Sequence, residues 1–240
     1  MARPDPATRM QQILDAAGAV FEQKGLERTR MSDVAETLGV SQGTLYYYFE
    51  GKEALYFTVL KRGARPGPVE VPEQLPVPNP AHGELTRLIE VKLKRAFKFP
   101  RIDAALKSTD VIDPREELQG VVAEAYDKIH RGRVSGNILQ RCAIDDPELS
   151  QAWFNTQRRG LVKRLSKYIE ARVRAGHFTR PPSVQVAARM LVESVTYFGR
   201  GRYHDPDCDS LTDDDAIRAT VIQLVSNGLL AGPPLELGDP

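Results

Sequence analysis

The proline-rich stretch at residues 66–80 constrains the folding of this chain more than any other feature. Its sequence, PGPVEVPEQLPVPNP, holds six of the 17 prolines in the chain. Proline lacks the backbone N–H that a helix needs, and its fixed φ favours extended, polyproline-type conformation. The stretch therefore predicts a linker. We expect one domain at residues 1–65 and a larger one at residues 81–240, because a chain of 240 residues is long enough for two domains.

Both sides of this linker are predicted to be helical. No segment shows the sustained apolar/polar alternation of a half-buried strand, whereas several carry apolar residues at positions i, i+3, i+4 and i+7. Asp113-Pro114 and Asp146-Pro147 each place a capping acid before a proline, which suits the first position of a helix. The predicted fold class is therefore all-α, with helices that start at these two prolines.

Three long helices are predicted in the larger domain. The first covers residues 148–176, and its apolar stripe consists of Trp153, Leu161, Leu165, Ile169 and Val173. Two more follow at residues 183–199 and 213–230. The last of them starts beside Thr212 and Asp215, which resemble a capping box.

The amino-terminal segment carries the strongest functional signal. Residues 8–24 form an amphipathic helix that Gly25 ends. Ser32 is a natural N-cap for the helix DVAETL, and Gly39 suits the left-handed conformation of a tight helix stop. Ser41 then caps a further short helix, QGTLYYYF. Two short helices joined by a turn that contains glycine are typical of a helix-turn-helix.

The second helix of this pair presents polar and aromatic side chains. Gln42 can pair with an adenine edge in the major groove, and Thr44 can bond a phosphate or a base. Tyr46 and Tyr47 offer hydroxyl groups to the DNA backbone. Lys52, at the start of the next helix, is suited to hold a phosphate beside unpaired helix amides. The residues predicted to point into the core are Leu45 and Phe49.

These residues resemble a known family. Residues 8–60, with ILDAAGAVFEQKG and MSDVAETLGVSQGTLYYYFEGKEAL in order, are similar to the DNA-binding domain of tetracycline-repressor-like (TetR) regulators. The resemblance implies three helices plus a connecting fourth, with the third helix in the major groove. The residues that would approach bases are Gln42, Gly43 and Tyr46, and those that would hold phosphates are Thr44, Tyr47, Tyr48 and Lys52. Ser32 would lie at the start of the supporting helix, near the DNA backbone.

Two features depart from the pattern of that family. Gly51 stands where the family usually has Ser or Asn as the N-cap of its fourth helix, a change that costs only a few tenths of a kcal/mol. The long proline-rich linker at residues 66–80 replaces a connection that is usually short. The linker puts the usual coupling between the two domains in doubt.

For the rest of the chain, the resemblance implies a helical ligand-binding and dimerisation domain. A homodimer would form through the last two helices, at about residues 183–199 and 213–230. Their apolar residues are Val184, Ala187, Ala188, Leu191, Val192, Val195 and Phe198 in the first helix, and Ile217, Val221, Leu224, Val225 and Leu229 in the second. Such a dimer presents two recognition helices about 34 to 36 Å apart, or a multiple of that, and predicts a palindromic operator.

The predicted function is that of a homodimeric, sequence-specific DNA-binding transcriptional regulator, a repressor that a small-molecule effector releases from its operator. The aromatic and aliphatic content indicates an apolar or amphipathic effector. The candidate pocket residues are Phe97, Tyr126, Trp153 and Phe154, for which ordinary core packing is the competing interpretation. The alternative function is a ligand-insensitive dimeric DNA-binding protein whose larger domain only dimerises.

Several other classes of function are disfavoured. Two cysteines and four histidines without ligand spacing give no signature of a metal site, and we expect no metal or other cofactor. No apolar run is long enough to span a membrane, residues 1–12 lack an apolar stretch of signal-peptide type, and the expected location is the cytoplasm. The net charge of +1 gives no global argument for nucleic acid, and the basic residues between Arg158 and Arg180 are best interpreted as a solvated helix face.

Two short enzyme motifs occur in the sequence and are rejected on their context. Gly39-Val40-Ser41-Gln42-Gly43 matches the G-x-S-x-G pattern, but a nucleophile elbow needs a strand before the serine, and here a helix precedes it. Tyr48 and Lys52 match the Tyr-x-x-x-Lys pair of short-chain dehydrogenases, yet no glycine-rich dinucleotide turn lies upstream. The sequence therefore predicts no enzyme activity.

Overall fold

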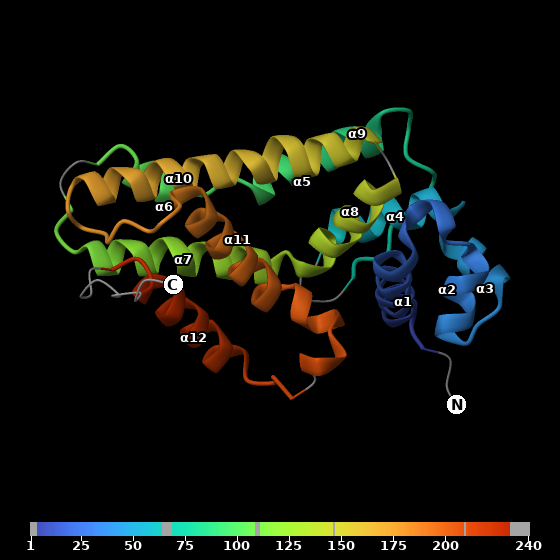
Figure 1. Ribbon diagram of the computed structural model, residues 1–240. Coiled ribbons are helices and arrows are strands. Elements are labelled where there is room, and N and C mark those ends of the chain that lie inside the picture. The colour runs from blue at the N-terminus through green and yellow to red at the C-terminus, as the bar shows by residue number, and fades with distance from the viewer. Residues whose placement is uncertain (1–3, 64–68, 109–110, 146, 209, 231–240) are drawn as a thin grey trace. The chain divides into compact units, whose positions relative to one another are not determined.

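The computed structural model describes residues 4–63, 69–108, 111–145, 147–208 and 210–230 (Figure 1). In these ranges the named elements are all helices, and β pairing is limited to two isolated bridges, Phe49 with Val77 and Phe178 with Leu230. The prediction of an all-α fold is confirmed. None of the described helices combines the length and the apolar character that crossing a membrane would require.

The chain divides into two compact units, but not at a single point along the sequence. One unit contains residues 1–95 and 132–155, and the other contains residues 96–131 and 156–240. The sequence predicts a linear division around residues 66–80 instead. The difference arises because part of the chain beyond the proline-rich stretch packs with the amino-terminal helices.

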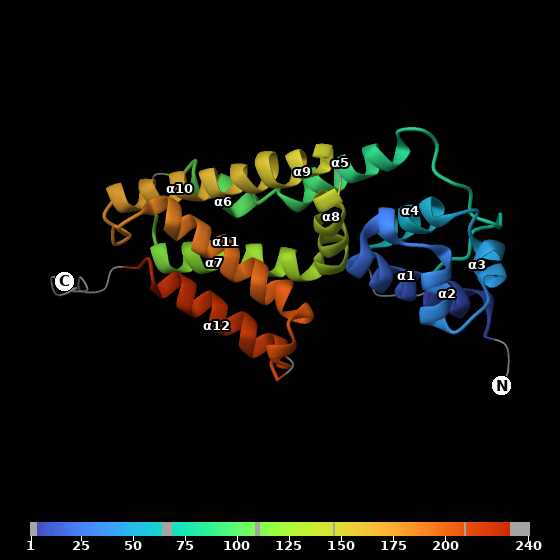
Figure 2. The ribbon, with the colours of Figure 1, turned by 45° about the vertical axis from the view of Figure 1, so that its right-hand side comes forward.

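The first unit is built around α1 (Pro6–Arg28), whose buried face includes Ile13, Leu14, Ala17 and Phe21. Its helical conformation is interrupted at Gly25, with φ of 75°, as the sequence predicts. The next helices are α2 (Met31–Leu38), α3 (Gln42–Tyr48) and α4 (Lys52–Arg62), followed beyond the proline-rich stretch by α5 (Glu84–Ala96). Both α2 and α4 pack on α1, and α3 packs on α2 (Figure 2).

The helix α8 (Arg133–Asp145) completes this unit by packing along α1. Its Asp145 accepts an ion-paired hydrogen bond of 2.8 Å from Arg28. Its buried Cys142 accepts a hydrogen bond of 3.1 Å from the hydroxyl of Tyr56 in α4. The amino-terminal helices are therefore anchored to a helix that lies about a hundred residues further along the chain, which the sequence analysis does not anticipate.

The second unit is a layered helical bundle in which α11 packs against α7, α10 and α12 (Figure 1). Its elements are α6 (Pro100–Ala105), α7 (Pro114–Arg131), α10 (Arg159–Arg174), α11 (Val184–Gly199), the 3-10 turns Gly201–His204 and Pro206–Cys208, and α12 (Asp214–Asn227). Apolar side chains from every one of its α-helices share one buried cluster. The burial of this cluster is the main stabilising contribution in the unit.

The predicted helix starts are largely correct. Asp113 accepts hydrogen bonds from the first amides of α7, and α11 begins after Ser183, whose hydroxyl accepts from Val186 N at 3.3 Å. The capping box predicted at Thr212 is wrong, because Asp213 is the residue that caps α12, through Ala216 N at 2.9 Å. The proposed cap Asp146 lies outside the described residues.

The long helix predicted at residues 148–176 is present but not uniform. It consists of α9 (Pro147–Ser150), a π-helical stretch at Gln151–Arg158 and then α10. A π-helix carries an extra residue per turn, so the apolar stripe does not continue in register from Trp153 to Leu161. Trp153 belongs to the first compact unit and Leu161 to the second.

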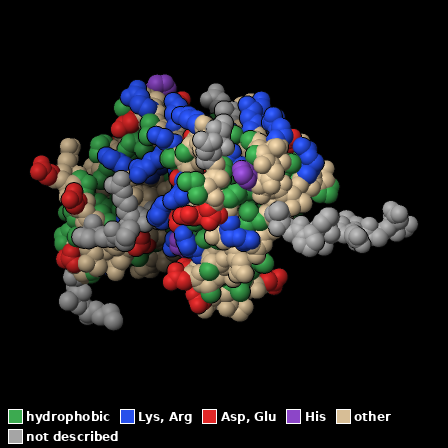
Figure 3. Space-filling model, turned by 90° about the vertical axis from the view of Figure 1, so that its left-hand side faces the viewer, with side chains coloured by type: hydrophobic (Ala, Val, Ile, Leu, Met, Phe, Trp, Pro, Cys, Tyr) green, Lys and Arg blue, Asp and Glu red, His purple; other side chains and the backbone are tan. Residues whose placement is uncertain are grey.

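The basic residues between Arg158 and Arg180 serve the structure of the second unit. Four of them form ion pairs: Arg158 with Glu193, Arg164 with Asp103, Arg172 with Glu117 and Arg180 with Glu170. Arg172 is only 3% exposed, and its bonds to Glu117 measure 2.7 and 2.9 Å. Figure 3 shows lysine and arginine side chains mixed with acidic ones on the face that it presents.

Candidate nucleic-acid interface

The turn between α2 and α3 has the geometry that its glycine predicts. Gly39 adopts φ of 69° and ψ of 38°, in the left-handed region, and its N–H donates to the carbonyls of Ala35 and Glu36 at the end of α2. Val40 N also donates to Ala35 O at 3.0 Å. A side chain with a Cβ would be strained at such a positive φ, so glycine allows the chain to turn directly into α3.

The helix α3 is fixed at its start and along its inner face. The Ser41 hydroxyl accepts from Thr44 N at 3.3 Å and lies 3.1 Å from the Thr44 hydroxyl, so the predicted N-cap is confirmed. Leu45 and Phe49 are fully buried. Because these two residues anchor one side of α3, the opposite side must face outward.

The outward face of α3 carries most of the residues predicted to contact DNA. Gln42 and Gly43 are exposed, Tyr46 is 48% exposed and Tyr47 is 64% exposed. Tyr46 follows Gln42 by four residues and therefore lies on the same helix face, and Tyr47 is its exposed neighbour. The structure thus provides a polar and aromatic surface with the dimensions of a helix, which fits the major groove of B-DNA.

Tyr48 differs from its two neighbours. Its side chain is only 7% exposed, and its ring packs edge-on against Tyr47 with centroids 5.1 Å apart. The sequence analysis assigns it a phosphate contact, but its environment is that of a packing residue. The three consecutive tyrosines could not be separated by composition, because a short helix turns consecutive residues by about 100° and only its packing partner decides which one is buried.

Ser32 is not the N-cap of its helix. Arg30 occupies the cap position of α2, and its backbone N–H donates to the carboxylate of Asp33 at 2.8 Å. This hydrogen bond, together with Lys24 at 3.0 Å, lowers the pKa of Asp33 below its ordinary value. Ser32 therefore lies within the first turn of α2, half-buried, and its predicted contact with the DNA backbone stays a prediction.

Lys52 has partners within the protein. Its ammonium group donates to the carbonyl oxygens of Leu26 and Glu27 at 3.1 and 3.3 Å, at the carboxyl end of α1. A lysine placed there satisfies carbonyls that the helix leaves unpaired. A phosphate contact at Lys52 would have to use the remaining N–H of the ammonium group or displace one of these carbonyls.

The sequence analysis misses two residues that support this surface, Val77 and Asn79 in the proline-rich stretch. Val77 forms backbone hydrogen bonds on both sides of Phe49, and Asn79 binds the first turn of α4. The one signal in the sequence is Gly51, which has no side chain to cap α4 and so indicates that another residue accepts from the first amides of this helix.

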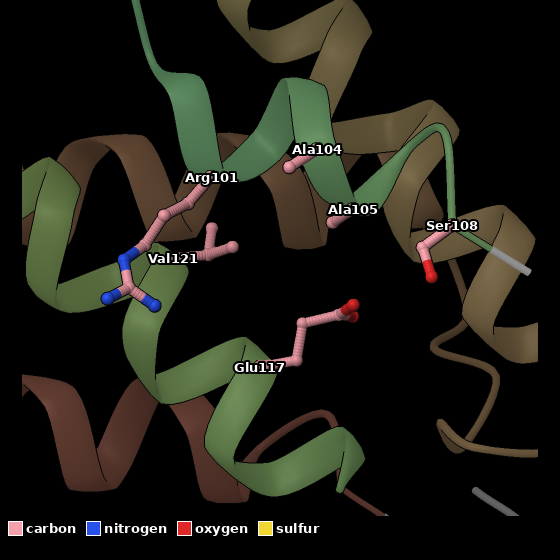
Figure 4. A pocket seen from close by; sticks show the side chains of 6 residues that line it. All are labelled: Arg101, Ala104, Ala105, Ser108, Glu117 and Val121. Carbon is pink, nitrogen blue, oxygen red and sulfur yellow. The ribbon is translucent and has the colours of Figure 1, made fainter. Parts of the chain in front are cut away.

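A shallow pocket of about 210 Å³ lies in the second unit, between α6 and α7 (Figure 4). Its lining residues are Arg101, Ala104, Ala105, Ser108, Glu117 and Val121. The pocket is smaller than the 300 to 1,000 Å³ that is usual for a drug-sized ligand, at about two thirds of the lower limit. The carboxylate of Glu117 is already bound by Arg172 and by the hydroxyl of Tyr168.

The four aromatic residues predicted to line an effector pocket do not line this one. Tyr126 and Trp153 are buried in the cores of the second and the first unit, at 2% and 4% exposure. Phe97 packs against the core of the second unit, and Phe154 is partly exposed. Ordinary core packing, the competing interpretation, describes Tyr126 and Trp153 well.

Comparison with known proteins identifies the amino-terminal helices. Residues 13–59 match the family model described as bacterial regulatory proteins, tetR family. The chain is 50% identical over 50 residues to the HTH-type transcriptional regulator RutR of Escherichia coli, and 41% identical over 59 residues to the uncharacterized HTH-type transcriptional regulator YfiR of Bacillus subtilis. These matches cover 21% and 25% of this chain, and 24% and 29% of the relatives, so the similarity in sequence spans about a quarter of either protein.

The similarity in fold to solved structures extends beyond the matched segment. The structure of the ketosteroid transcriptional regulator KstR2 of Mycobacterium tuberculosis superposes with a TM-score of 0.55 at 19% identity, covering 93% of this chain and 96% of that one. At this identity the likeness concerns the fold alone. The segment at residues 13–59, with its helix-turn-helix geometry, thus matches the tetR family of bacterial regulatory proteins, and the rest of the described chain shares the fold of such a regulator.

Proposed function

We propose that the protein is a homodimeric transcriptional repressor that binds a palindromic operator through α3 and leaves it when a small molecule binds the second unit. The observation that carries the DNA-binding part is the division of α3 into two faces. Leu45 and Phe49 anchor the helix, while Gln42, Tyr46 and Tyr47 remain accessible. In this proposal, Gln42, Gly43 and Tyr46 read bases, and Thr44 and Tyr47 bind phosphates.

The dimer part of the proposal rests on apolar residues of the last two helices that stay exposed. Val186 is 56% exposed, Met190 64% and Tyr197 39% on α11, and Leu224 is 66% exposed on α12. These two helices pack against each other, so the four side chains belong to neighbouring elements. A second copy that covers them would bury apolar surface that water otherwise contacts.

Selection of bound duplexes from a random pool tests the DNA-binding part. The expected outcome is enrichment of an inverted repeat, because a two-fold dimer presents two α3 helices to two half-sites. Gln42→Ala should relax the preference at one position of each half-site at a cost of about 1 to 3 kcal/mol. Gln23→Ala, which alters an exposed glutamine on α1, is the control and should keep the selected sequence. Equal weakening on every duplex by Gln42→Ala would contradict the base-reading role.

Sedimentation analysis tests the dimer. Met190→Asp should shift the protein to a monomer and abolish binding to the paired half-sites, since it places a charge in the proposed interface. Val91→Asp changes a side chain of similar exposure, 57%, on α5 and should leave the dimer intact. Equal dimerisation of both variants would place the interface elsewhere.

The alternative function is a dimeric DNA-binding protein that responds to no effector. The small size of the pocket between α6 and α7 favours this alternative, whereas the polar groups of that pocket favour an amphipathic ligand. A thermal-shift screen with amphipathic and apolar compounds separates the two. A ligand at 100 times its dissociation constant adds about 2.7 kcal/mol of apparent stability, and a regulator with an effector should also release its operator when that compound is present.

A further inference from the structure

The proline-rich stretch folds back onto the segment that connects α3 to α4. Val77 N donates to Tyr48 O at 2.8 Å, and Glu50 N donates to Val77 O at 3.0 Å. The two bonds lie on either side of Phe49 and form a parallel bridge between Phe49 and Val77. Because Tyr48 is the last residue of α3, the carboxyl end of the recognition helix is tied to a segment that lies almost thirty residues downstream.

Asn79 holds the other end of this connection. Its side-chain Oδ1 accepts a hydrogen bond of 3.2 Å from Ala54 N, in the first turn of α4, and its own N–H donates to the carboxylate of Glu50 at 2.9 Å. The residue at the N-cap position of α4 is Gly51, which has no side chain to accept such a bond. Asn79 therefore supplies, from a distant part of the sequence, the cap that a serine or asparagine at residue 51 would supply locally.

The proline content of this segment lowers the cost of ordering it. Proline restricts the unfolded chain, so fixing residues 76–80, three of which are proline, loses less conformational entropy than fixing an ordinary loop. The recognition helix gains more from the attachment than a long helix would. A helix of seven residues is too short to be stable by itself and depends on contacts at its ends and along its inner face.

We propose that residues 77–79 are a positioning strap for the recognition helix, with Asn79 as a positioning residue for DNA binding. The strap fixes the connection between α3 and α4 and thereby sets the orientation in which Gln42 and Tyr46 meet the major groove. The inference rests on the proposed DNA-binding function. The prolines suggest that this segment is only a spacer between two domains. In this inference it is attached directly to the recognition helix instead.

The test uses the full-length chain and the variant Asn79→Ala, at a temperature where both are folded by circular dichroism. Hydrogen exchange at the amide of Ala54 reports the strap itself, and affinity for the selected operator reports its effect on DNA binding. Loss of an N-cap side chain predicts exchange about fivefold faster at Ala54 and operator affinity about fivefold weaker. Asn155→Ala, an exposed asparagine elsewhere in the same unit, is the control and should change neither quantity.

Rescue separates positioning from a general loss of stability. A Cβ at Gly51 would lie 3.2 Å from Asn79 Oδ1, so Gly51→Ser crowds the wild-type strap, but Asn79→Ala removes that atom. The backbone of Gly51 is extended, with φ of −167°, and accepts a serine without strain. In the double variant the new hydroxyl can cap α4, and we expect it to restore slow exchange at Ala54 and most of the operator affinity.

The outcomes distinguish this inference from the function on which it rests. Slow exchange at Ala54 in Asn79→Ala would show that the bond does not hold the helix, and faster exchange with unchanged operator affinity would show that the strap does not position α3. Either result overturns the inference. Failure of the wild-type chain to bind any selected duplex overturns the proposed function, and the positioning role with it, whatever the exchange at Ala54. Loss of both slow exchange at Ala54 and operator affinity in Asn79→Ala, and recovery of both when Gly51→Ser is added, support the strap.

Discussion

The buried pair of Arg172 and Glu117 allows a quantitative prediction for the second unit. Arg172 is 3% exposed, and Glu117 binds it through both carboxylate oxygens, at 2.7 and 2.9 Å. The same arginine donates to Ala105 O at 2.6 Å, and Tyr168 donates to Glu117 at 3.0 Å. The pKa of Arg172 is raised, chiefly by its hydrogen bonds to Glu117, so the guanidinium stays charged inside the protein.

Glu117→Gln removes the negative charge and preserves the shape of the side chain. Breaking a buried ion pair on one side costs about 3 to 5 kcal/mol, because the remaining charge is left uncompensated. The side chain of Glu117 is 21% exposed, so water can replace part of the lost interaction, and we take the lower end, about 3 kcal/mol. With a urea m-value of about 2 to 3 kcal/mol/M, the midpoint should fall by about 1 to 1.5 M.

Urea denaturation followed by circular dichroism measures the change in the free energy of unfolding. Hydrogen exchange at the backbone amides of α7 reports the same loss locally. Glu170→Gln breaks the exposed pair of Glu170 with Arg180, whose side chains are 33% and 60% accessible, and should cost less than about 1 kcal/mol. The double variant Glu117→Gln with Arg172→Met should recover part of the loss, since no charge is then left buried. A cost for Glu117→Gln no larger than that for Glu170→Gln would refute the reasoning from burial.

Two further predictions concern the first unit. Burial raises the pKa of Glu22 to about 7 against the opposing effects of Asn137 and Arg133, so its charged form is disfavoured in the folded state. The free energy of unfolding should therefore fall as the pH rises from about 4.5 to 7. After allowance for solvent screening, Glu22→Gln should stabilise the protein by about 1 to 2 kcal/mol at pH 8 and by almost nothing at pH 4. Thermal denaturation at each pH measures the difference. Leu45→Ala should destabilise the helix-turn-helix by about 2 to 5 kcal/mol and weaken binding to all duplexes alike, because Leu45 is fully buried and faces away from the proposed DNA surface. A Leu45→Ala protein that changes operator preference, or a Glu22→Gln protein with unaltered pH dependence, would contradict these interpretations.

The helix-turn-helix could be predicted because its determinants are local. Gly39 fixes the turn by its positive φ, Ser41 caps the next helix, and Leu45 follows at the spacing that reaches the core. Each of these effects acts between residues at most four positions apart, so it can be recognised from the sequence without knowledge of the fold. Ser32 shows the limit of such reasoning, because a capping residue type stood two positions from the actual cap, Arg30, and propensity alone cannot distinguish adjacent turns.

The features that escaped prediction depend on partners far apart in the sequence. Asp145 meets Arg28 across more than a hundred residues, and Asn79 meets Ala54 across 25. Neither contact is visible in the sequence as a periodic pattern, because each involves one polar side chain that bonds one distant group. The return of α8 to the first unit is of the same kind, since an amphipathic helix shows which face it buries but not the helix that covers it.

The proposed dimer surface illustrates how packing reassigns an apolar stripe. The sequence analysis attributes a wide stripe on α11 to dimerisation, but Ala188, Leu191 and Val195 from that stripe are buried within the same chain. What remains exposed on α11 is a second row that includes Val186 and Met190, four residues apart and therefore on one face. Packing against α7, α10 and α12 covers the first row of α11 and leaves this second row exposed to water. We therefore still expect a dimer through α11 and α12, but its α11 side chains would be Val186, Met190 and Tyr197, which the sequence analysis did not single out, whereas it did name Leu224 on α12.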